Sequence, residues 1–408
     1  MEFIVSRNRL LAALKHTRRV IKPNNDIKAL RCFVFTFDGD VMTVQAANAD
    51  ELMQERMALE QPAVDPRPIA IWYDEILRPV SSLDDQPLHF TIGESQLAVR
   101  HSCGTFRIPL ADYAQEFLDF TRSLPELEAD DCLMLEYEAP ALRSVLKRCK
   151  FAMAQDELRP SMNGVYMNLT PDYADYVSSD GHKLVRVRKS AVRVGDVSVT
   201  ASLILPSRVV NTMLAVLPRT GDVDFSYLPP IYEEVTKGDK KEKVCKRRAA
   251  ASFTIDDGLT LVFRPVDGRY PAYWSVIPDY RHFEMCLDRL QLIKSVDRLS
   301  FFSVSSGLER FSLNADNTVR INAEDADFEY AAEESLPCDI KRTDGKEYGG
   351  GVSFGMKGVS LSETLKVLPS EKVVFSVIDS TRAIIIQPAT QPDTEELTML
   401  LMPMLIND

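Results

Sequence analysis

The chain has 408 residues, of which 45% are hydrophobic and 26% are charged. This length predicts more than one hydrophobic core, because single cores seldom grow beyond about 250–300 residues. The formal net charge of −12 has the wrong sign for a protein that holds nucleic acid by general electrostatic attraction. A role on DNA therefore requires basic residues that are segregated on one face.

No segment of the sequence resembles a membrane span or a secretory signal. The longest apolar runs, such as Ile384–Ile386 and Leu400–Met402, are far shorter than the roughly 18 residues that a spanning helix needs. Met1–Arg7 lacks the basic stretch and apolar block of a signal peptide. The seven cysteines form no C-x-x-C pair, which argues against a disulfide framework or a zinc site. We expect a cytoplasmic protein with reduced thiols and no cofactor.

A short apolar strand that runs into an amphipathic helix occurs three times, beginning at Glu2, Leu133 and Phe283. Each helix has apolar residues three or four positions apart, which gives one buried stripe. A second strand-to-helix pattern follows in each part of the chain, at 69–77, 203–214 and 352–365.

Alternating segments with turn signals between these helices, such as Phe33–Phe37 before Asp38-Gly39, predict antiparallel hairpins. The sequence therefore predicts an α+β fold with three topologically similar domains, 1–127, 128–280 and 281–408. Each domain should place two helices against an antiparallel sheet. The polar segments 228–248 and 342–351 are interpreted as solvated insertions, and a nucleic-acid role for the first of them is the less favoured alternative.

The helices that follow the first strand of each domain carry basic residues away from their apolar stripes. In the first helix the stripe contains Leu10, Leu11, Leu14 and Ile21. Solvated helices often carry lysine and arginine, but the recurrence on three corresponding helices favours a shared DNA-facing surface. The candidate DNA-facing residues are Arg9, Lys15, Arg19, Arg143, Lys147, Lys150, Arg289 and Lys294.

Several motifs resemble the bacterial sliding clamp family, the β subunits of the DNA polymerase III holoenzyme. They are Phe151–Val165, Ser178–Leu184, Val266–Tyr273 and the C-terminal Leu401–Leu405. Each motif is weak alone, but their order and spacing agree with that family over the whole chain.

The resemblance implies a DNA clamp fold and a head-to-tail homodimer that forms a ring around double-stranded DNA without sequence specificity. It also implies a processivity factor without a catalytic site, which tethers the replicative DNA polymerase catalytic subunit and other replication and repair proteins that carry a clamp-binding motif. An ATP-driven clamp loader complex would open the ring. A ring of this kind can close by one two-fold operation on two copies with different ends.

In this family, partner peptides dock in an apolar cleft between the second and third domains. The matching positions are Arg159, Met162, Ser179, Gly181, His182, Lys183, Leu184, Pro271, Val276, Leu400, Leu401, Met402, Pro403 and Met404. Adaptable methionine side chains suit a site that accepts several peptides. An edge strand packed into its own core is the alternative reading of the C-terminal segment. Dimer contacts by Phe106 and Ile108 with Leu299 of a second copy are a further expectation from the resemblance.

Three positions depart from the family pattern. Pro160-Ser161 stands where many relatives have two tyrosines, Ser275 replaces a common arginine, and the chain ends in Leu405–Asp408 without the familiar basic residue. Arg159 is retained. The peptide preference and the tyrosine-mediated DNA contact of the family are therefore not carried over to this chain.

Two other classes of protein remain open from the sequence. A hydrolase would need converging ligands or a nucleophile motif, yet no H-E-x-x-H, G-x-x-x-x-G-K-[ST] or G-x-S-x-G pattern occurs. Asp180-Gly181-His182 is the best argument for that class, and it also reads as a plain turn. A monomeric scaffold would have the same cleft but would not form a ring. Sedimentation distinguishes the two classes, because a scaffold stays monomeric whereas a clamp dimerises.

Overall fold

The computed structural model describes residues 1–122, 127, 132–156, 158–190, 200–237, 240–256, 258–278, 280–325, 328–346 and 348–406. Its contacts divide it into two compact units. The first unit contains Met1–Pro140 and Ala215–Pro265, and the second contains most of the remaining chain. No helix in these described residues is long and apolar enough to cross a membrane.

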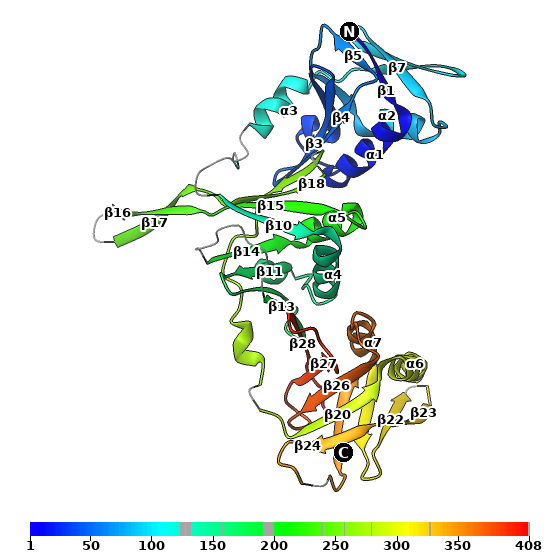
Figure 1. Ribbon diagram of the computed structural model, residues 1–408, viewed down its shortest axis with the longest axis vertical. Coiled ribbons are helices and arrows are strands. Elements are labelled where there is room, and N and C mark those ends of the chain that lie inside the picture. The colour runs from blue at the N-terminus through cyan, green and yellow to red at the C-terminus, as the bar shows by residue number, and fades with distance from the viewer. Residues whose placement is uncertain are drawn as a thin grey trace. The chain divides into compact units, whose positions relative to one another are not determined.

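A similar order of elements occurs three times along the chain, although the described part of the second repeat has four strands between its two helices where the others have five (Figure 1). The first repeat is β1 (Glu2–Ser6), α1 (Arg7–Thr17), β2 (Cys32–Asp38), β3 (Val41–Ala47), β4 (Glu51–Ala58), β5 (Gln61–Val64), β6 (Ile69–Trp72), α2 (Tyr73–Ser81), β7 (Pro87–Ile92), β8 (Gln96–His101) and β9 (Gly104–Pro109). Helix α3 (Ala114–Thr121) follows it.

The second repeat is β10 (Leu133–Glu138), α4 (Ala139–Lys150), β11 (Gly164–Leu169), β12 (Tyr173–Ser179), β13 (Lys183–Ser190), β14 (Ala201–Pro206), α5 (Ser207–Val216), β15 (Asp222–Leu228), β16 (Ile231–Lys237), β17 (Lys240–Arg247), β18 (Ala250–Ile255) and β19 (Leu259–Phe263). The third is β20 (Phe283–Asp288), α6 (Arg289–Leu299), β21 (Leu308–Leu313), β22 (Thr318–Asp325), β23 (Tyr330–Pro337), β24 (Asp339–Arg342), β25 (Val352–Lys357), α7 (Gly358–Lys366), β26 (Lys372–Val377), β27 (Ile384–Pro388) and β28 (Glu395–Leu401).

The first unit contains a five-stranded sheet in the order β5-β1-β7-β8-β9 and an eight-stranded sheet in the order β10-β15-β18-β19-β4-β3-β2-β6. All pairs in them are antiparallel, and β19 joins β4 with Leu261 opposite Met53. Helices α1 and α2 lie side by side, and α1 packs on β3 and β4. The predicted stripe of α1 is confirmed, because Leu10, Leu11 and Leu14 are all buried.

The second unit contains a nine-stranded sheet in the order β14-β11-β12-β13-β28-β27-β26-β20-β24 and a four-stranded sheet in the order β23-β22-β21-β25. Strand β13 of the second repeat pairs with β28 of the third, with Leu184 opposite Leu400. Helices α6 and α7 pack against each other. The rings of Phe311 and Phe354 stack at 5.4 Å on neighbouring strands of the four-stranded sheet.

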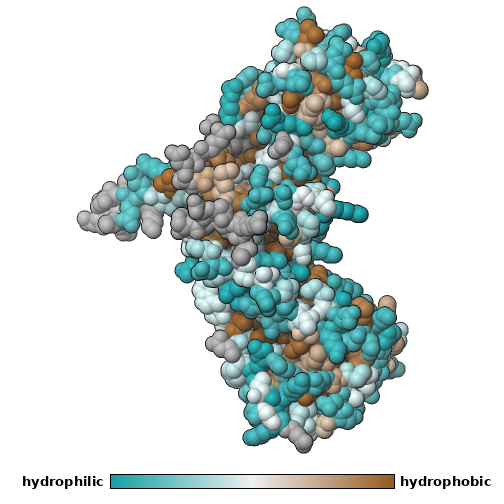
Figure 2. Space-filling view, viewed as in Figure 1, coloured by the Kyte–Doolittle hydropathy of each residue, from teal (hydrophilic) through white to brown (hydrophobic). Residues whose placement is uncertain are grey.

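The segment 228–248 corrects one expectation. Instead of an irregular insertion it forms the antiparallel ribbon of β16 and β17, which extends from β15 and β18 (Figure 1). The many charges masked a β pattern that includes Tyr232, Val235 and Val244, residue types that favour extended backbone. The second polar segment stays mostly irregular and is held by Tyr348, whose hydroxyl donates to the Leu313 carbonyl at 3.3 Å. Hydrophilic side chains cover most of the face seen in Figure 2.

Candidate functional site

Three segments that are far apart in the sequence meet beside the β13–β28 pair in the second unit. A buried apolar cluster brings together Leu184 of β13, Leu400 of β28, and Tyr270 and Tyr273 of the intervening segment. The backbone N–H of Met402 donates to the carbonyl of His182 at 2.8 Å and so extends the pairing past β28. The structure therefore brings the predicted cleft segments 179–184, 271–276 and 400–404 close together.

The turn between β12 and β13 is held by its own hydrogen bonds. The Asp180 carboxylate accepts from the backbone N–H groups of His182 and Lys183, both at 2.9 Å. The hydroxyl of Ser179 donates to the Lys183 carbonyl at 2.9 Å and accepts from the N–H of Gly181 at 3.1 Å. Gly181 has φ of +93°, a conformation that favours glycine, and a Cβ there would lie 3.2 Å from Nη1 of Arg159. These hydrogen bonds fix the shape of the turn, and the Arg159 side chain lies against it.

A buried charge network anchors the segment around Tyr273. Asp175, in the middle of β12, is fully buried and accepts two hydrogen bonds from the Arg188 guanidinium, each at 2.7 Å. It accepts a third from the Tyr273 hydroxyl at 2.8 Å. Burial raises the pKa of Tyr273 above its usual value, and the hydrogen bond to Asp175 raises it further. The network therefore fixes the short 3₁₀ helix η4 (Tyr273–Val276), which carries Val276, to the sheet.

In a cleft of the kind that the resemblance implies, the buried residues would form the floor and the exposed residues the rim. Met162, Leu184, Leu400 and Leu401 are buried. Val276 is 53% exposed and Met402 is 43% exposed, and Pro271 and His182 are exposed too. Exposed Trp274, between Tyr273 and Val276, would lie on the same rim and was not predicted from the sequence. Its position beside the quoted Tyr273 was the available signal.

The C-terminal segment is partly an edge of its own domain. The backbone N–H of Met404 donates to the carbonyl of Gly355 in β25 at 2.8 Å. A Cβ on Gly355 would lie 2.8 Å from the Met404 carbonyl oxygen, so only glycine allows this approach. Half-buried Pro403 lies between exposed Met402 and anchored Met404. The edge-strand alternative therefore describes Met404, which pairs with Gly355, whereas Met402 is exposed, and Leu400 and Leu401 lie on β28 inside the nine-stranded sheet.

Six of the eight candidate DNA-facing residues are exposed, and two are not available as expected. The exposed ones are Arg9, Lys15, Arg19, Lys147, Lys150 and Lys294. Half-buried Arg143 instead donates to the Leu214 carbonyl in the last turns of α5 at 2.9 Å. Half-buried Arg289 donates to the carbonyls of Leu365, at 3.1 Å, and Ser370 at and beyond the end of α7.

The same device occurs in the first repeat, where Arg7 donates to the carbonyls of Val80 and Ser81 at the end of α2. In each repeat an arginine in the first half of the first helix thus binds carbonyls at the C-terminal end of the second helix. These carbonyls have no partner inside their helix, and a cation there also interacts favourably with the helix dipole. Arg143 and Arg289 are therefore structural, which corrects their assignment to a DNA-facing surface.

The expected dimer contacts also need correction. Leu299 is 1% exposed, in the stripe of α6 that faces its own sheet, and Ile108 is 5% exposed. Half-buried Phe106 lies against His101, with ring centroids 4.6 Å apart. Leu299 is too buried to face a second copy, whereas Phe106 and Ile108 lie on β9, an edge strand of its sheet, and stay a prediction.

The hydrolase alternative depends on the Asp180-Gly181-His182 motif and on converging metal ligands. Within the described residues no group of three or more His, Cys, Asp or Glu side chains could hold a metal ion. His182 of the Asp180-Gly181-His182 motif is exposed, and the Asp180 carboxylate is engaged by backbone N–H groups. That motif is a turn.

Comparisons with known proteins agree with the motifs. Residues 136–244 match the family model of the DNA polymerase III beta subunit, central domain. The beta sliding clamp of Pseudomonas putida is 24% identical over 406 residues, which cover 98% of this chain and 99% of the relative. The beta sliding clamp of Treponema pallidum is 20% identical, with 98% and 99% covered.

Solved structures agree in fold over the full length of the chain. The sliding clamp of Pseudomonas aeruginosa bound to griselimycin has a TM-score of 0.82 at 21% identity, and both chains are covered completely. The beta subunit of DNA polymerase III from Thermotoga maritima has a TM-score of 0.80 at 17% identity, again with complete coverage. The resemblance read from the motifs is thereby confirmed: the chain is related over its whole length to the bacterial beta sliding clamps and has the fold of the DNA polymerase III beta subunits.

Proposed function

We propose that this protein is a DNA sliding clamp, a processivity factor that encircles duplex DNA and tethers the replicative polymerase. The observation that carries the proposal is the full-length relationship to beta sliding clamps. The outer strands β9 and β23 add to it, because they correspond to strands that pair between repeats within the chain. We divide the chain into three clamp domains, 1–127, 128–280 and 281–408, because a similar order of elements begins at β1, β10 and β20. No catalytic step is part of this function.

The free edges support ring closure by a second copy. Within the sheets, the row of strands that begins with β6, β14 or β25 ends at β4, β13 or β23, the first group of end strands. The row that begins with β1, β10 or β20 ends at β9, β19 or β28, the second group. Within the chain β4 pairs with β19 and β13 pairs with β28, both antiparallel. In both pairs a strand of the first group joins a strand of the second group. Of these six strands, β23 and β9 are left without such a partner among the described residues, and they belong to different groups. One copy's β23 pairing with β9 of the next gives a head-to-tail ring that closes by a two-fold operation.

Charge and apolar surface support this joint. In the β13–β28 joint Arg148 and Lys189 of the second repeat both bind Glu395, and Arg186 binds Glu396 of the third repeat. The free edges also differ in charge, but in the reverse sense: β9 carries Arg107, whereas β23 carries Glu333 and Glu334, which pair with Arg320 and Arg298 of their own repeat. Exposed aromatic side chains lie next to β23, which a second copy would cover: Phe301, Phe302, Phe328 and Tyr330.

A substitution next to β23 tests the joint. Phe328 is 55% exposed and stacks on Tyr330 at 5.8 Å, so Phe328→Asp should leave the fold intact and weaken self-association about tenfold. Sedimentation velocity across a concentration series measures the change. Val359→Asp is the matched control, because Val359 is 56% exposed in the same repeat but lies at the start of α7. Equal weakening by both variants would place the joint elsewhere, and a stable monomer of the unmodified protein would favour the scaffold alternative.

The exposed cations of the first helices supply the DNA contact that we propose. Arg9, Lys15, Arg19, Lys147, Lys150 and Lys294 are the candidates that remain after Arg143 and Arg289 are removed. Contacts of this kind reach phosphates and carry no sequence information. Such binding is weak and salt-sensitive, and closure of the ring around DNA supplies the retention that these contacts lack.

The cleft beside the β13–β28 joint is the proposed docking site for client proteins, among them the polymerase catalytic subunit, the clamp loader and other proteins with a clamp-binding motif. Its buried floor and exposed apolar rim suit an extended peptide with apolar anchors. Val276→Ala with Met402→Ala should weaken binding of a peptide from the organism's own polymerase about tenfold, because both rim side chains lose contact area. Isothermal titration measures the affinity. Leu405→Ala, at a residue 81% exposed beyond the rim, is the control.

Topological retention tests the whole function. After loading, the protein should stay on nicked circular DNA at a salt concentration that disrupts non-specific electrostatic contacts. It should leave the DNA once the circle is linearised. Gel filtration of the loaded complex before and after cleavage gives the comparison. Loss at the same rate from circular and linear DNA would refute the clamp.

A further inference from the structure

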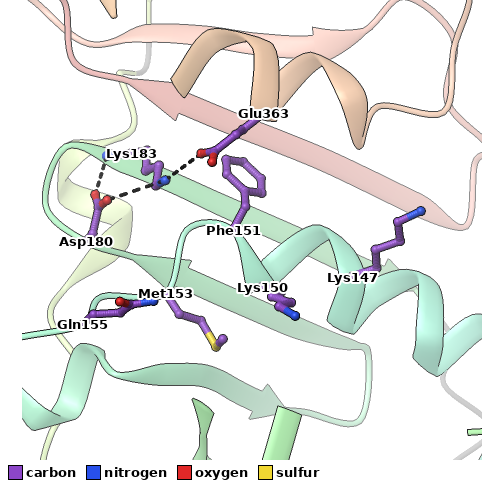
Figure 3. Close-up of a pocket in the computed structure, with 8 residues that line it drawn as sticks. All are labelled: Lys147, Lys150, Phe151, Met153, Gln155, Asp180, Lys183 and Glu363. Carbon is purple, nitrogen blue, oxygen red and sulfur yellow. Dashed lines mark hydrogen bonds and ion pairs between the residues drawn. The ribbon is translucent and has the colours of Figure 1, made fainter. Parts of the chain in front are cut away.

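A hollow of about 560 Å³ lies beside the β12–β13 turn (Figure 3). Its lining comes from the end of α4, the segment after it, the turn itself and α7, all in the second unit. The lining residues are Lys147, Lys150, Phe151, Met153, Gln155, Asp180, Lys183 and Glu363. The hollow thus combines three lysines with two carboxylates.

Two of the three lysines are exposed and form no ion pair in the described part of the chain. They are Lys147 and Lys150, which lie in the last turn of α4. Both were expected on the DNA-facing surface from the sequence, and they set the charge of this side of the hollow.

The third lysine, Lys183, already has partners in the hollow. Nζ of Lys183 lies 3.1 Å from Oε2 of Glu363 and 3.9 Å from Oδ2 of Asp180. It also lies 5.3 Å from the centre of the Phe151 ring, and only 15% of the Lys183 side chain is exposed. Because the ammonium group covers the face of Phe151, a nucleobase would have to displace it to stack there. A phosphate oxygen would need only an ammonium group.

We propose that this hollow binds a backbone phosphate of duplex DNA, and that Glu363 occupies Lys183 until the phosphate replaces it. The proposal rests on the proposed function, because duplex DNA is the ligand. The exchange is feasible because the Glu363 side chain is 46% exposed and regains water when it releases Lys183. The phosphate then binds the ammonium group of Lys183 in a hollow that Lys147 and Lys150 also line, and the exposed carboxylate of Glu363 tunes the affinity for DNA.

Removal of the carboxylate charge tests the proposal. Glu363→Gln should tighten binding of a short DNA duplex about threefold in low salt, since Lys183 is then free for the phosphate. The plot of log affinity against log salt should become steeper by up to about 0.9, the value for one further phosphate contact. Fluorescence anisotropy over a sodium chloride series measures both quantities.

Glu371→Gln is the matched control, because it makes the same change in net charge at an exposed position of the same repeat outside the hollow. Screening in about 0.1 M salt limits such distant charges, so this variant should stay close to the unmodified protein. Equal tightening by Glu363→Gln and Glu371→Gln would overturn the proposal. Lys183→Met in the Glu363→Gln background should remove the gain, and a gain that persists would also overturn it.

The lysines of α4 complete the test. Lys147→Met with Lys150→Met should weaken duplex binding and reduce the effect of Glu363→Gln, whereas Lys372→Met, at an exposed lysine on β26, should do neither.

With sodium phosphate in place of chloride at equal ionic strength, the Glu363→Gln advantage should persist, and its disappearance would assign the hollow to free phosphate. Binding by the unmodified protein without the Glu363→Gln gain refutes only this inference. No duplex binding by any variant would also overturn this inference, whereas the proposed function is tested separately by retention on circular DNA.

Discussion

Replacing Asp175 with alanine is expected to destabilise the protein by about 3 kcal/mol. The fully buried carboxylate accepts three hydrogen bonds, two from Arg188 and one from Tyr273. Alanine leaves the guanidinium without its counter-charge and the hydroxyl without its acceptor. The cost falls at the low end for a broken buried pair, because the Arg188 side chain is 33% exposed and can turn toward water.

Urea unfolding followed by circular dichroism measures this loss. Arg188→Met in the Asp175→Ala background should recover part of the stability, because the double variant no longer buries an unpaired charge. No recovery would mean that the loss comes from packing. Tyr273→Phe removes a single hydrogen bond and should cost about 1 kcal/mol.

The same network predicts an effect on the cleft. Tyr273 begins η4, which carries Trp274 and Val276 on the exposed rim. When Asp175 is removed, the hydrogen bond that ties this segment to β12 is lost. Tyr273→Phe should therefore weaken client peptide binding more than its small cost in stability implies. An unchanged peptide affinity would show that the rim is held by the apolar cluster alone.

The spacing of apolar residues and the threefold repetition of strand-to-helix patterns were sufficient to predict most of the fold. The stripe of α1 and the threefold order of elements follow from spacing, because a buried face imposes its period on the residues. The ribbon of β16 and β17 was missed because abundant charge obscured the alternation. Leu299 should have been assigned to the core, since Leu292, Val296 and Leu299 form one stripe of α6 and all are buried.

The site was predictable only where its residues are consecutive. The segments 179–184 and 400–404 come together as expected, because β13 and β28 pair. The Asp175 network was invisible, because it joins two strands and η4 through side chains whose spacing has no period. The roles of Arg143 and Arg289 depend on a neighbouring helix end, which helical periodicity does not reveal. The recurrence of an arginine near the start of each first helix was the one available signal.

A buried carboxyl in the third repeat gives the second large prediction. Glu309, on β21, is fully buried, and its Oε1 accepts a hydrogen bond from the Ser300 hydroxyl at 3.0 Å. A Cβ on Gly358, at the start of α7, would lie 2.2 Å from that oxygen, so the carboxyl is packed tightly against the helix. Burial raises the pKa of Glu309 to about 7, the Ser300 hydrogen bond lowers it, and the nearby carboxylates Asp297 and Glu334 raise it.

The direction of the pH effect follows from this shift. The folded protein holds the Glu309 proton up to about pH 7, whereas the unfolded chain releases it near the usual value of 4.5. Between these values the folded state binds more protons, so rising pH lowers the free energy of unfolding. The loss reaches about 3 kcal/mol above pH 7 and then stays constant. Other groups add their own pH dependence, so a variant must isolate this one.

Glu309→Gln removes the ionisation and keeps the shape. The variant should gain up to about 3 kcal/mol over the unmodified protein at pH 8 and little at pH 4.5, where the carboxyl is protonated in the fold. Urea unfolding at a series of pH values measures the difference. Glu371→Gln, at an exposed position of the same repeat, should show no such trend. Because the introduced amide would still lie between Ser300 and α7, a gain that is constant with pH would point to packing, and only a gain that grows from pH 4.5 to pH 7 identifies a carboxyl that the fold keeps neutral.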